Sequence, residues 1–225
     1  MGLAEFLNFG QSFNLDKVPA RFLKVLCFIL LASSALLISG CASPPARPDN
    51  ICDIFTEKRG WYKAARSSSK RWGGPVTVPM AIMYQESGYR HDAKPPMRYF
   101  LWIIPYGRAS SAYGYAQVKT GTWGDYQKDA GSMFSDRDDF GDAIDFVFWY
   151  MNISQRRNGV SKWDAYNQYL NYHEGHGGYA RGSYKNKAWL KGVARKVERR
   201  SKTYSAQYSE CKKRLEGGWL RRLFS

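Results

Sequence analysis

The chain has 225 residues, with 34 Lys and Arg against 19 Asp and Glu, so its formal net charge is +15. This length allows one domain with a substantial hydrophobic core, and the lack of any internal repeat excludes a repeat array. The positive charge predicts an acidic partner.

The first forty residues differ in kind from the rest of the chain. Three basic residues between Lys17 and Lys24 precede an uncharged run from Val25 to Gly40. The run is short for a membrane span and ends in small residues just before Cys41, so residues 1–40 predict an export signal that is cleaved. The remaining chain would keep a charge of +14, because the signal carries three basic and two acidic side chains. Export also excludes cytoplasmic nucleic acid as the acidic partner.

The segment Leu37-Ile38-Ser39-Gly40-Cys41 resembles the lipobox of bacterial lipoproteins. The resemblance implies that Cys41 becomes the lipid-modified first residue of the mature chain and holds it at a membrane. An ordinary secretory signal with an incidental cysteine is the alternative. Ala42 and Ser43 follow Cys41, and the absence of Asp there favours an outer-membrane lipoprotein facing the periplasm under the sorting rule of enteric lipoproteins.

The residues that follow Cys41 are small, polar and rich in proline, so residues 41–50 predict an extended tether. We assign the folded domain to residues 51–210. Cys52 and Cys211 lie at its two ends, and in an oxidising periplasm we expect them to pair rather than remain free thiols. In the chain-entropy model such a disulfide would stabilise the fold by up to about 4 to 5 kcal/mol.

The end of the chain is strongly basic. Between Arg181 and Ser225 it has fourteen Lys or Arg against three Glu. Residues 211–225 are assigned to a basic, aromatic tail. Its last part, Gly217 to Phe224, suits an anionic membrane surface, and a disordered end fits the same composition.

Apolar residues follow helical spacing through most of the domain. No alternation of period two is sustained, so the predicted fold class is all-α, or α-rich, with at most a small hairpin between Tyr99 and Tyr113. The expected helices are one from Ile51 that ends in the polar run before Gly73, one from Thr77 to Gly88, one from Phe140 to Asn158, one from Ser161 to Gly175, and one through Trp189, Val193 and Val197.

The short helix that starts at Thr77 carries a candidate catalytic carboxylate. Thr77 can cap this helix, Pro79 suits its first turn, and Gly88 is a natural end. Ile82 and Glu86 are four residues apart, so the apolar face also presents Glu86. Partial burial would raise the pKa of Glu86 and keep it protonated near neutral pH, as a general acid requires. A Glu that simply reaches solvent at a helix end is the alternative.

Three short segments occur in order along the domain: Gln85-Glu86-Ser87-Gly88-Tyr89, Tyr113-Gly114-Tyr115-Ala116-Gln117 and Asn171-Tyr172-His173-Glu174-Gly175. Together they resemble the soluble lytic transglycosylase family. The resemblance implies a single lysozyme-like domain that cleaves the bond between N-acetylmuramic acid and N-acetylglucosamine in peptidoglycan, giving 1,6-anhydro-muramyl products. It also implies that no metal or cofactor is needed.

The resemblance also assigns individual residues. Glu86 matches the catalytic acid and base, and the substrate-binding positions are Ser87, Gly114, Tyr115, Gln117, Tyr172 and His173. Two features depart from the family pattern. His173 stands where the family usually has Asn, and residues 94–108 form an aromatic insertion, suited either to stacking on sugar rings or to packing over the core.

Ordinary glycoside hydrolysis uses two carboxylates. A second catalytic carboxylate in this chain would therefore indicate a hydrolytic muramidase. The acids near the three segments are Asp92, Asp125 and Glu174. Glu174 is the best of them, although a solvated loop acid is the simpler interpretation. His173 and His176 with Glu174 are too weak a pattern to predict a metal site.

A third hypothesis is a protein without catalytic activity. The same fold could bind peptidoglycan, or act as a scaffold lipoprotein with protein partners in an envelope assembly such as a secretion machine.

The acidic partners available outside the cytoplasm are anionic phospholipid, lipopolysaccharide and the carboxylates of peptidoglycan. Charge alone does not choose among these partners.

Overall fold

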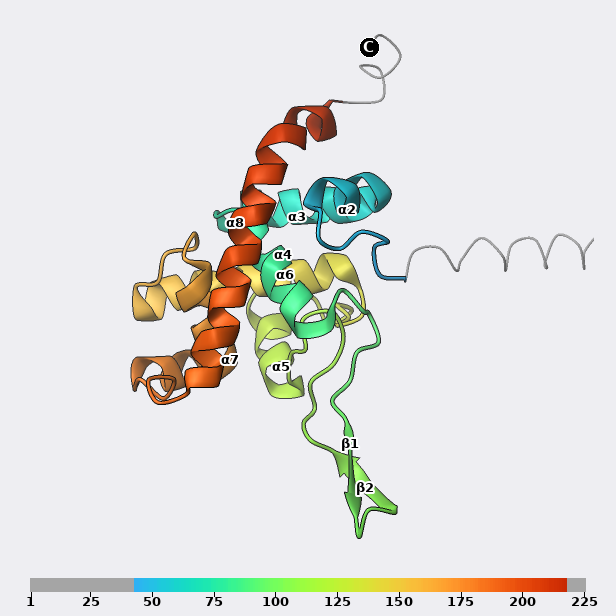
Figure 1. The fold of residues 1–225 in the computed structure, drawn as a ribbon, viewed down its shortest axis with the longest axis vertical. Coiled ribbons are helices and arrows are strands. Elements are labelled where there is room, and N and C mark those ends of the chain that lie inside the picture. The colour runs from blue at the N-terminus through green and yellow to red at the C-terminus, as the bar shows by residue number, and fades with distance from the viewer. Residues whose placement is uncertain (1–42, 218–225) are drawn as a thin grey trace, which may run out of the picture. The chain divides into compact units, whose positions relative to one another are not determined.

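The structure is a computed structural model that describes residues 43–217 (Figure 1). The predicted signal at 1–40, Cys41 and the end of the tail at 218–225 lie outside the described residues. The described residues belong to one compact unit, and its hydrophobic core is built from residues between Ile51 and Leu215. This part of the chain therefore holds a complete core of its own. No helix among the described residues is long and apolar enough to span a membrane.

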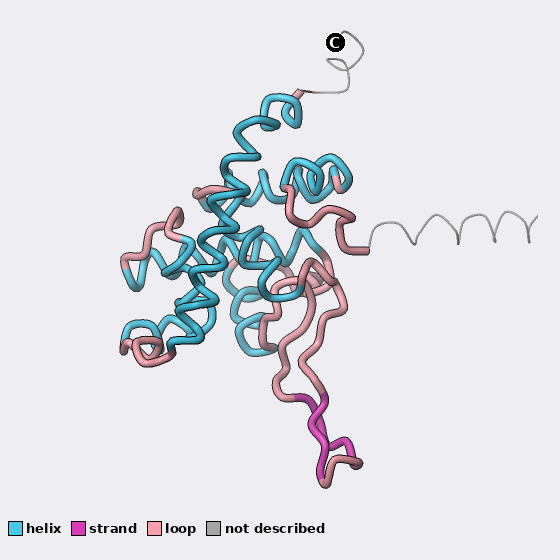
Figure 2. The backbone as a smooth tube through the Cα atoms, in the orientation of Figure 1, coloured by secondary structure: helices cyan, strands magenta, loops and turns pink. Residues whose placement is uncertain are grey.

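Seven helices and one small antiparallel sheet make up the described chain (Figures 1 and 2), which confirms the α-rich class. They are α2 (Ile51–Glu57), α3 (Arg59–Trp72), α4 (Thr77–Ser87), β1 (Met97–Phe100), β2 (Ile104–Arg108), α5 (Thr120–Asp129), α6 (Phe140–Asn158), α7 (Ala165–Ala180) and α8 (Ala188–Glu216).

Helix α6 is the centre of the fold. It is buried along most of its length and packs on α3, α4 and α7. The Trp61 ring of α3 stacks on Phe140 of α6, with ring centroids 4.0 Å apart. The long helix α8 packs across α2, α4 and α7. Helix α4, which carries Glu86, is thus held between α6 and α8.

Several boundaries differ from those expected. The first predicted helix is two helices, because Lys58 leaves helical geometry (φ −106°, ψ 71°) between α2 and α3. Helix α5 was not predicted. Helix α8 continues past the expected domain boundary at 210 to Glu216, because Cys211 and Leu215 are buried on the face that also holds its earlier apolar residues.

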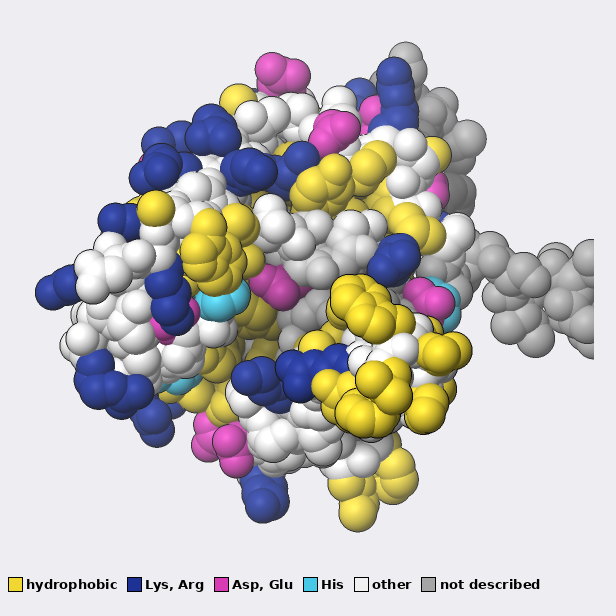
Figure 3. Space-filling model, turned by 60° about the horizontal axis from the view of Figure 1, so that its bottom comes forward, with side chains coloured by type: hydrophobic (Ala, Val, Ile, Leu, Met, Phe, Trp, Pro, Cys, Tyr) yellow, Lys and Arg dark blue, Asp and Glu magenta, His cyan; other side chains and the backbone are white. Residues whose placement is uncertain are grey.

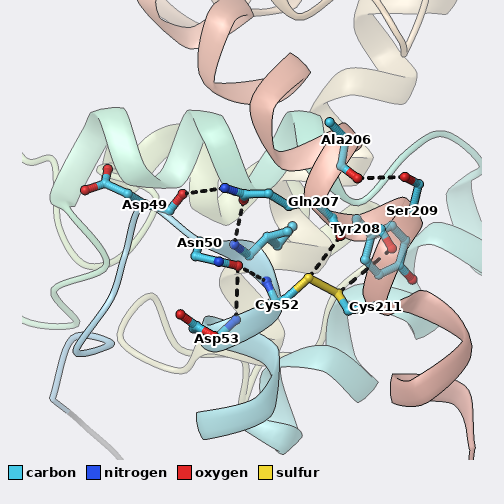
Figure 4. The surroundings of a disulfide bond; sticks show 10 residues. Asp49, Asn50, Cys52, Asp53, Ala206, Gln207, Tyr208, Ser209 and Cys211 are labelled. Carbon is cyan, nitrogen blue, oxygen red and sulfur yellow. Dashed lines mark hydrogen bonds between the residues drawn. A yellow bond between two sulfur atoms is a disulfide. The ribbon is translucent and has the colours of Figure 1, made fainter.

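The segment before α2 is packed against the domain rather than free as a tether. Gln207 of α8 donates through Nε2 to the Asp49 carbonyl (3.2 Å) and accepts from the Ile51 amide (3.1 Å). A disulfide joins Cys52 of α2 to Cys211 of α8, with 6.0 Å between their Cα atoms (Figure 4). These contacts fasten the start of the described chain to its last helix.

The two strands lie within the predicted insertion at 94–108. They pair antiparallel with Met97 opposite Arg108 and Phe100 opposite Ile104. Figures 1 and 2 show this hairpin extending away from the helices on two long loop segments. The insertion therefore does not pack over the core, which removes one of the two roles considered for it.

Candidate active site

Glu86 lies in the last turn of α4 and is half-buried. The helix ends there because Gly88 adopts the left-handed conformation (φ 61°, ψ 30°), as expected. The expectation that Thr77 caps its start was wrong. Val76 occupies the cap position, and the buried Thr77 hydroxyl instead contacts Ser201 of α8 at 3.5 Å.

The Glu86 side chain lines a cavity of about 340 Å³ between α4, α6, α7 and the loop that precedes α5. The other residues that line it are Gln117, Val118, Lys119, Thr122, Phe146, Tyr150, Tyr172, His173, Glu174 and Gly175. Aromatic rings together with a few polar groups are typical of a ligand-binding cavity, in which the polar groups orient the ligand.

Burial raises the pKa of the Glu86 carboxyl from 4.5 to about 7, because removal from water penalises its charged form. The Tyr169 hydroxyl of α7 donates a hydrogen bond to this carboxylate, which lowers the pKa but does not offset burial. Burial and the Glu86 charge raise the pKa of Tyr169 itself, so it remains a donor. Near neutral pH Glu86 can therefore both give and accept a proton.

Two hydroxyl groups bring the three sequence segments together. Ser87 donates to the Tyr115 carbonyl at 2.7 Å, and Tyr172 donates to the Ala116 carbonyl at 2.6 Å. The donors come from the first and third segments, and the acceptors are consecutive residues of the second. The middle segment is thus bonded to α4 on one side and to α7 on the other, which fixes the wall of the cavity next to Glu86.

The middle segment turns tightly at Gly114, where φ is 74°. A Cβ atom at this position would lie 2.0 Å from the Arg137 carbonyl oxygen, so only glycine fits. Gln117 also has a positive φ of 48°, and its Nε2 donates to the carbonyls of Ala93 (2.8 Å) and Gly114 (2.9 Å). The Gln117 amide nitrogen therefore stabilises the turn while the side chain lines the cavity.

The structure separates the predicted substrate-binding residues into two groups. Gln117, Tyr172 and His173 line the cavity together with Glu86. The residues that do not line it, and instead build the turn beside it, are Ser87, Gly114 and Tyr115.

Sequence reasoning missed Tyr169, the hydrogen-bond donor to Glu86. A signal for it existed, because Tyr169 lies three residues before Tyr172 and side chains at that spacing share a helix face. Phe146 and Tyr150 of α6 also line the cavity, and the sequence analysis singled out neither of them. The Tyr150 and Tyr172 rings pack at 5.2 Å and 68°.

Glu174 lines the same cavity but is held by other groups. Burial raises its pKa, yet hydrogen bonds from Lys187 (2.8 Å), Ser183 and His173 (3.1 Å) favour the ionised form more strongly and lower the pKa to about 2. Its side chain is only 5% exposed, so Glu174 is an ion-paired carboxylate rather than a solvated loop acid. Of the other acids considered, Asp125 lines a neighbouring cavity and Asp92 lines neither.

That neighbouring cavity has a volume of about 850 Å³. It shares Thr122, Tyr150 and Gly175 with the Glu86 cavity, so the two adjoin. The space beside Glu86 thus continues into a second cavity.

Within residues 43–217, no three His, Cys, Asp or Glu side chains gather in a group that could hold a metal ion. His176 instead stacks on the Tyr150 ring at 4.1 Å and bonds to the Ser154 hydroxyl at 3.1 Å. His173 packs edge-on against Trp189 at 5.2 Å.

No curated protein matches this sequence. The sequence does match the family described as Transglycosylase SLT domain over residues 28–211, which is most of the chain and includes every residue of the site. The chain therefore belongs to the Transglycosylase SLT domain family and has, at the level of that family, a lytic transglycosylase type of function that acts on peptidoglycan.

Proposed function

We propose that this protein is an active lytic transglycosylase that cleaves the β-1,4 bond between N-acetylmuramic acid and N-acetylglucosamine and leaves a 1,6-anhydro-muramyl end. The observation that carries the proposal is the Glu86 carboxyl, whose pKa is raised to about 7 at the wall of a cavity. A scaffold that only binds glycan has no need for a desolvated carboxyl, which costs folding free energy when ionised.

Glu86 serves in two successive steps. In the first, protonated Glu86 donates its proton to the glycosidic oxygen as the bond from that oxygen to the muramyl anomeric carbon breaks, and the acetamido group of the substrate stabilises the cation. In the second, the Glu86 carboxylate takes the proton of the muramyl 6-hydroxyl. The oxygen of that hydroxyl bonds to the anomeric carbon at the same time. The proton balance closes without water or a second carboxylate.

Tyr169 supports both steps as a positioning residue. Its hydroxyl donates to the Glu86 carboxylate and so orients the group after the first proton has left. Gln117, Tyr172 and His173 share the cavity and would contact the sugar rings.

A hydrolytic muramidase is the less favoured function. It would need a second carboxylate to activate water or attack the sugar. Glu174 is the carboxylate in the right cavity, but Lys187 and Ser183 occupy its oxygens, and a pKa of about 2 makes it a poor base.

Mass spectrometry of soluble products from purified sacculi tests the proposal. Residues 42–225 should release muropeptides that end in anhydro-muramic acid. Products with reducing ends would instead establish hydrolysis and give Glu174 a catalytic role. Sacculus binding with no released product would show a glycan-binding or scaffold protein.

The raised pKa of Glu86 predicts the pH dependence of this reaction. The first step requires the protonated acid, so kcat/KM should fall about tenfold per pH unit above about pH 7. Tyr169→Phe removes a hydrogen bond that lowers this pKa, so the fall should begin at higher pH in that variant. Initial rates across the pH range check both statements. A wild-type rate that is still rising well above pH 7 would contradict the role of Glu86 as the acid.

We also propose that lipid on Cys41 holds the enzyme in the cell envelope, at the outer membrane and facing the periplasm. The support is the lipobox-like segment that ends at Cys41. Cys41→Ser should convert a membrane-bound protein into a soluble periplasmic one, and full retention in the membrane fraction would refute lipid anchoring.

A further inference from the structure

The tip of the β1–β2 hairpin is the largest run of exposed apolar side chains in the described structure. Trp102 is 96% exposed, and Figure 3, in which the lower end of Figure 1 comes forward, shows hydrophobic side chains gathered there. The exposed apolar residues of the hairpin are Tyr99, Phe100, Leu101, Trp102, Ile103, Ile104 and Tyr106. Soluble surfaces rarely expose so continuous an apolar run, and when they do it usually marks a contact site.

The turn at the tip retains bulky residues at a conformational cost. Leu101 (φ 48°) and Trp102 (φ 67°) are both left-handed, and the Ile103 amide closes the turn on the Phe100 carbonyl at 3.2 Å. A four-residue turn with positive φ at both central positions strongly favours Asn-Gly there. Leu and Trp weaken the turn, so their side chains are better explained by an external contact than by folding.

The arrangement of the apolar side chains indicates which class of partner covers them. From position 99 to 104 they are consecutive, so they point to both faces of the ribbon as well as beyond its end. A glycan strand would stack on one face only. No residue of this hairpin lines the Glu86 cavity or the one that adjoins it. A surrounding that covers all sides, such as lipid acyl chains, fits this geometry.

Basic residues stand at the base of the hairpin. The Arg98 and Arg108 side chains bond to the carbonyls of Ala109 (3.4 Å) and Pro95 (2.7 Å), which holds them beside the strands. Lys94 lies over the Tyr113 ring at 5.1 Å. Apolar and aromatic residues at a tip with cations behind them match the profile of a membrane interface, from acyl chains to phosphate groups.

We propose that this hairpin inserts its tip into the interface of an anionic phospholipid bilayer. Leu101 and Trp102 enter the acyl boundary, and the three cations at the base meet the lipid phosphates. The net charge of +14 that remains without residues 1–40 favours the same surface by long-range attraction. The contact is separate from both catalysis and lipid modification, since its residues lie outside the cavities and do not include Cys41.

Vesicle sedimentation tests this inference with residues 42–225, which contain the complete core but not Cys41. The probe is vesicles of phosphatidylglycerol and phosphatidylethanolamine, with phosphatidylcholine vesicles for comparison. The wild type should bind the anionic vesicles preferentially. The double variant Leu101→Asn/Trp102→Gly should bind them on the order of tenfold or more weakly, because it loses the two side chains at the tip.

The double variant suits the turn better than the native pair does, so its melting temperature should be equal or higher. The matched control is Met133→Ser/Phe134→Ser, which removes two other apolar side chains that are 81% and 88% exposed, and its vesicle binding should be unchanged. Equal binding by the tip variant and the wild type would overturn the inference. A wild-type dimer that the tip variant abolishes, seen by sedimentation velocity, would replace lipid with a second copy of the chain.

Discussion

Glu86→Gln should reduce the release of anhydro-muropeptides from sacculi by on the order of a thousandfold or more. Gln keeps the shape of the side chain and can still accept the Tyr169 hydrogen bond, but it has no proton to give to the glycosidic oxygen and no charge to act as base. General acid and base catalysis contributes about 10² to 10⁴ in rate at each such position, and here one residue supplies both. Quantitative mass spectrometry of the released products measures the loss.

A stability measurement distinguishes a lost catalytic group from a damaged fold. The pKa of Glu86 is raised on folding, so the wild type is most stable when Glu86 is protonated and loses stability as pH rises from 4.5 through about 7. The full loss is at most about 3 kcal/mol for a shift of this size. Glu86→Gln lacks this penalty, so it should melt at a higher temperature than the wild type above about pH 8 and at a similar one below about pH 4.

Glu198→Gln is the matched control for both measurements. Glu198 is a surface residue of α8 that pairs with Lys202 at 2.6 Å, four residues further along the helix. Loss of such an exposed pair changes stability by about 0.5 kcal/mol or less, and product release should stay at the wild-type level. If Glu86→Gln retained wild-type release, the catalytic carboxyl would have to be another residue, and Glu174 is the one in the same cavity.

The sequence was sufficient to predict the helices that have clear end signals. Gly88 and Gly159 end α4 and α6 in the left-handed conformation, at the positions where glycine follows an apolar ladder. Helix α5 lacked such a signal. It includes Gly121 and Gly124, and its only buried residues are Trp123 and Tyr126, so its apolar pattern is too short to reveal a helix.

The sequence predicted which residues belong to the candidate site better than it predicted the role of each residue. The order of three segments indicated that Glu86, Gln117 and Tyr172 belong together, and they line one cavity. Sequence spacing could not show that Ser87 bonds to the carbonyl of Tyr115, because that contact depends on how two distant loops meet. Ser87, expected to bind substrate, is instead bonded to the segment that carries Gln117.

The insertion shows the same limit of sequence reasoning. Its aromatic and aliphatic residues were equally compatible with packing over the core and with exposure, because composition does not specify direction. In the structure the hairpin extends away from the helices on two loop segments, and the turn at Leu101 and Trp102 forms its far tip (Figure 2). The positive φ values at that turn could not be read from a Leu-Trp pair, which disfavours them.

Removal of the disulfide by Cys52→Ser/Cys211→Ser should lower the melting temperature by roughly 10 to 20 °C. The bond closes a loop with a sequence separation of 159, for which the chain-entropy model gives an upper value of about 4 to 5 kcal/mol. Each kcal/mol corresponds to about 2 to 4 °C in a domain of this size. Residues 42–225 contain no other cysteine, so the wild type under strong reductant should melt like the double variant.

The loss of stability caused by removal of the disulfide should be confined to one end of the fold. Helix α2 has only seven residues, and its other ties to α8 include the Gln207 bonds to the Asp49 carbonyl and the Ile51 amide. Without the disulfide, α2 and the last turns of α8 should exchange amide hydrogens faster than the remainder. Helix α4 packs on α6 and on other parts of α8, so Glu86 should keep its position. The double variant should therefore still release anhydro-muropeptides at 25 °C, and inactivity while folded would show that the disulfide also shapes the site.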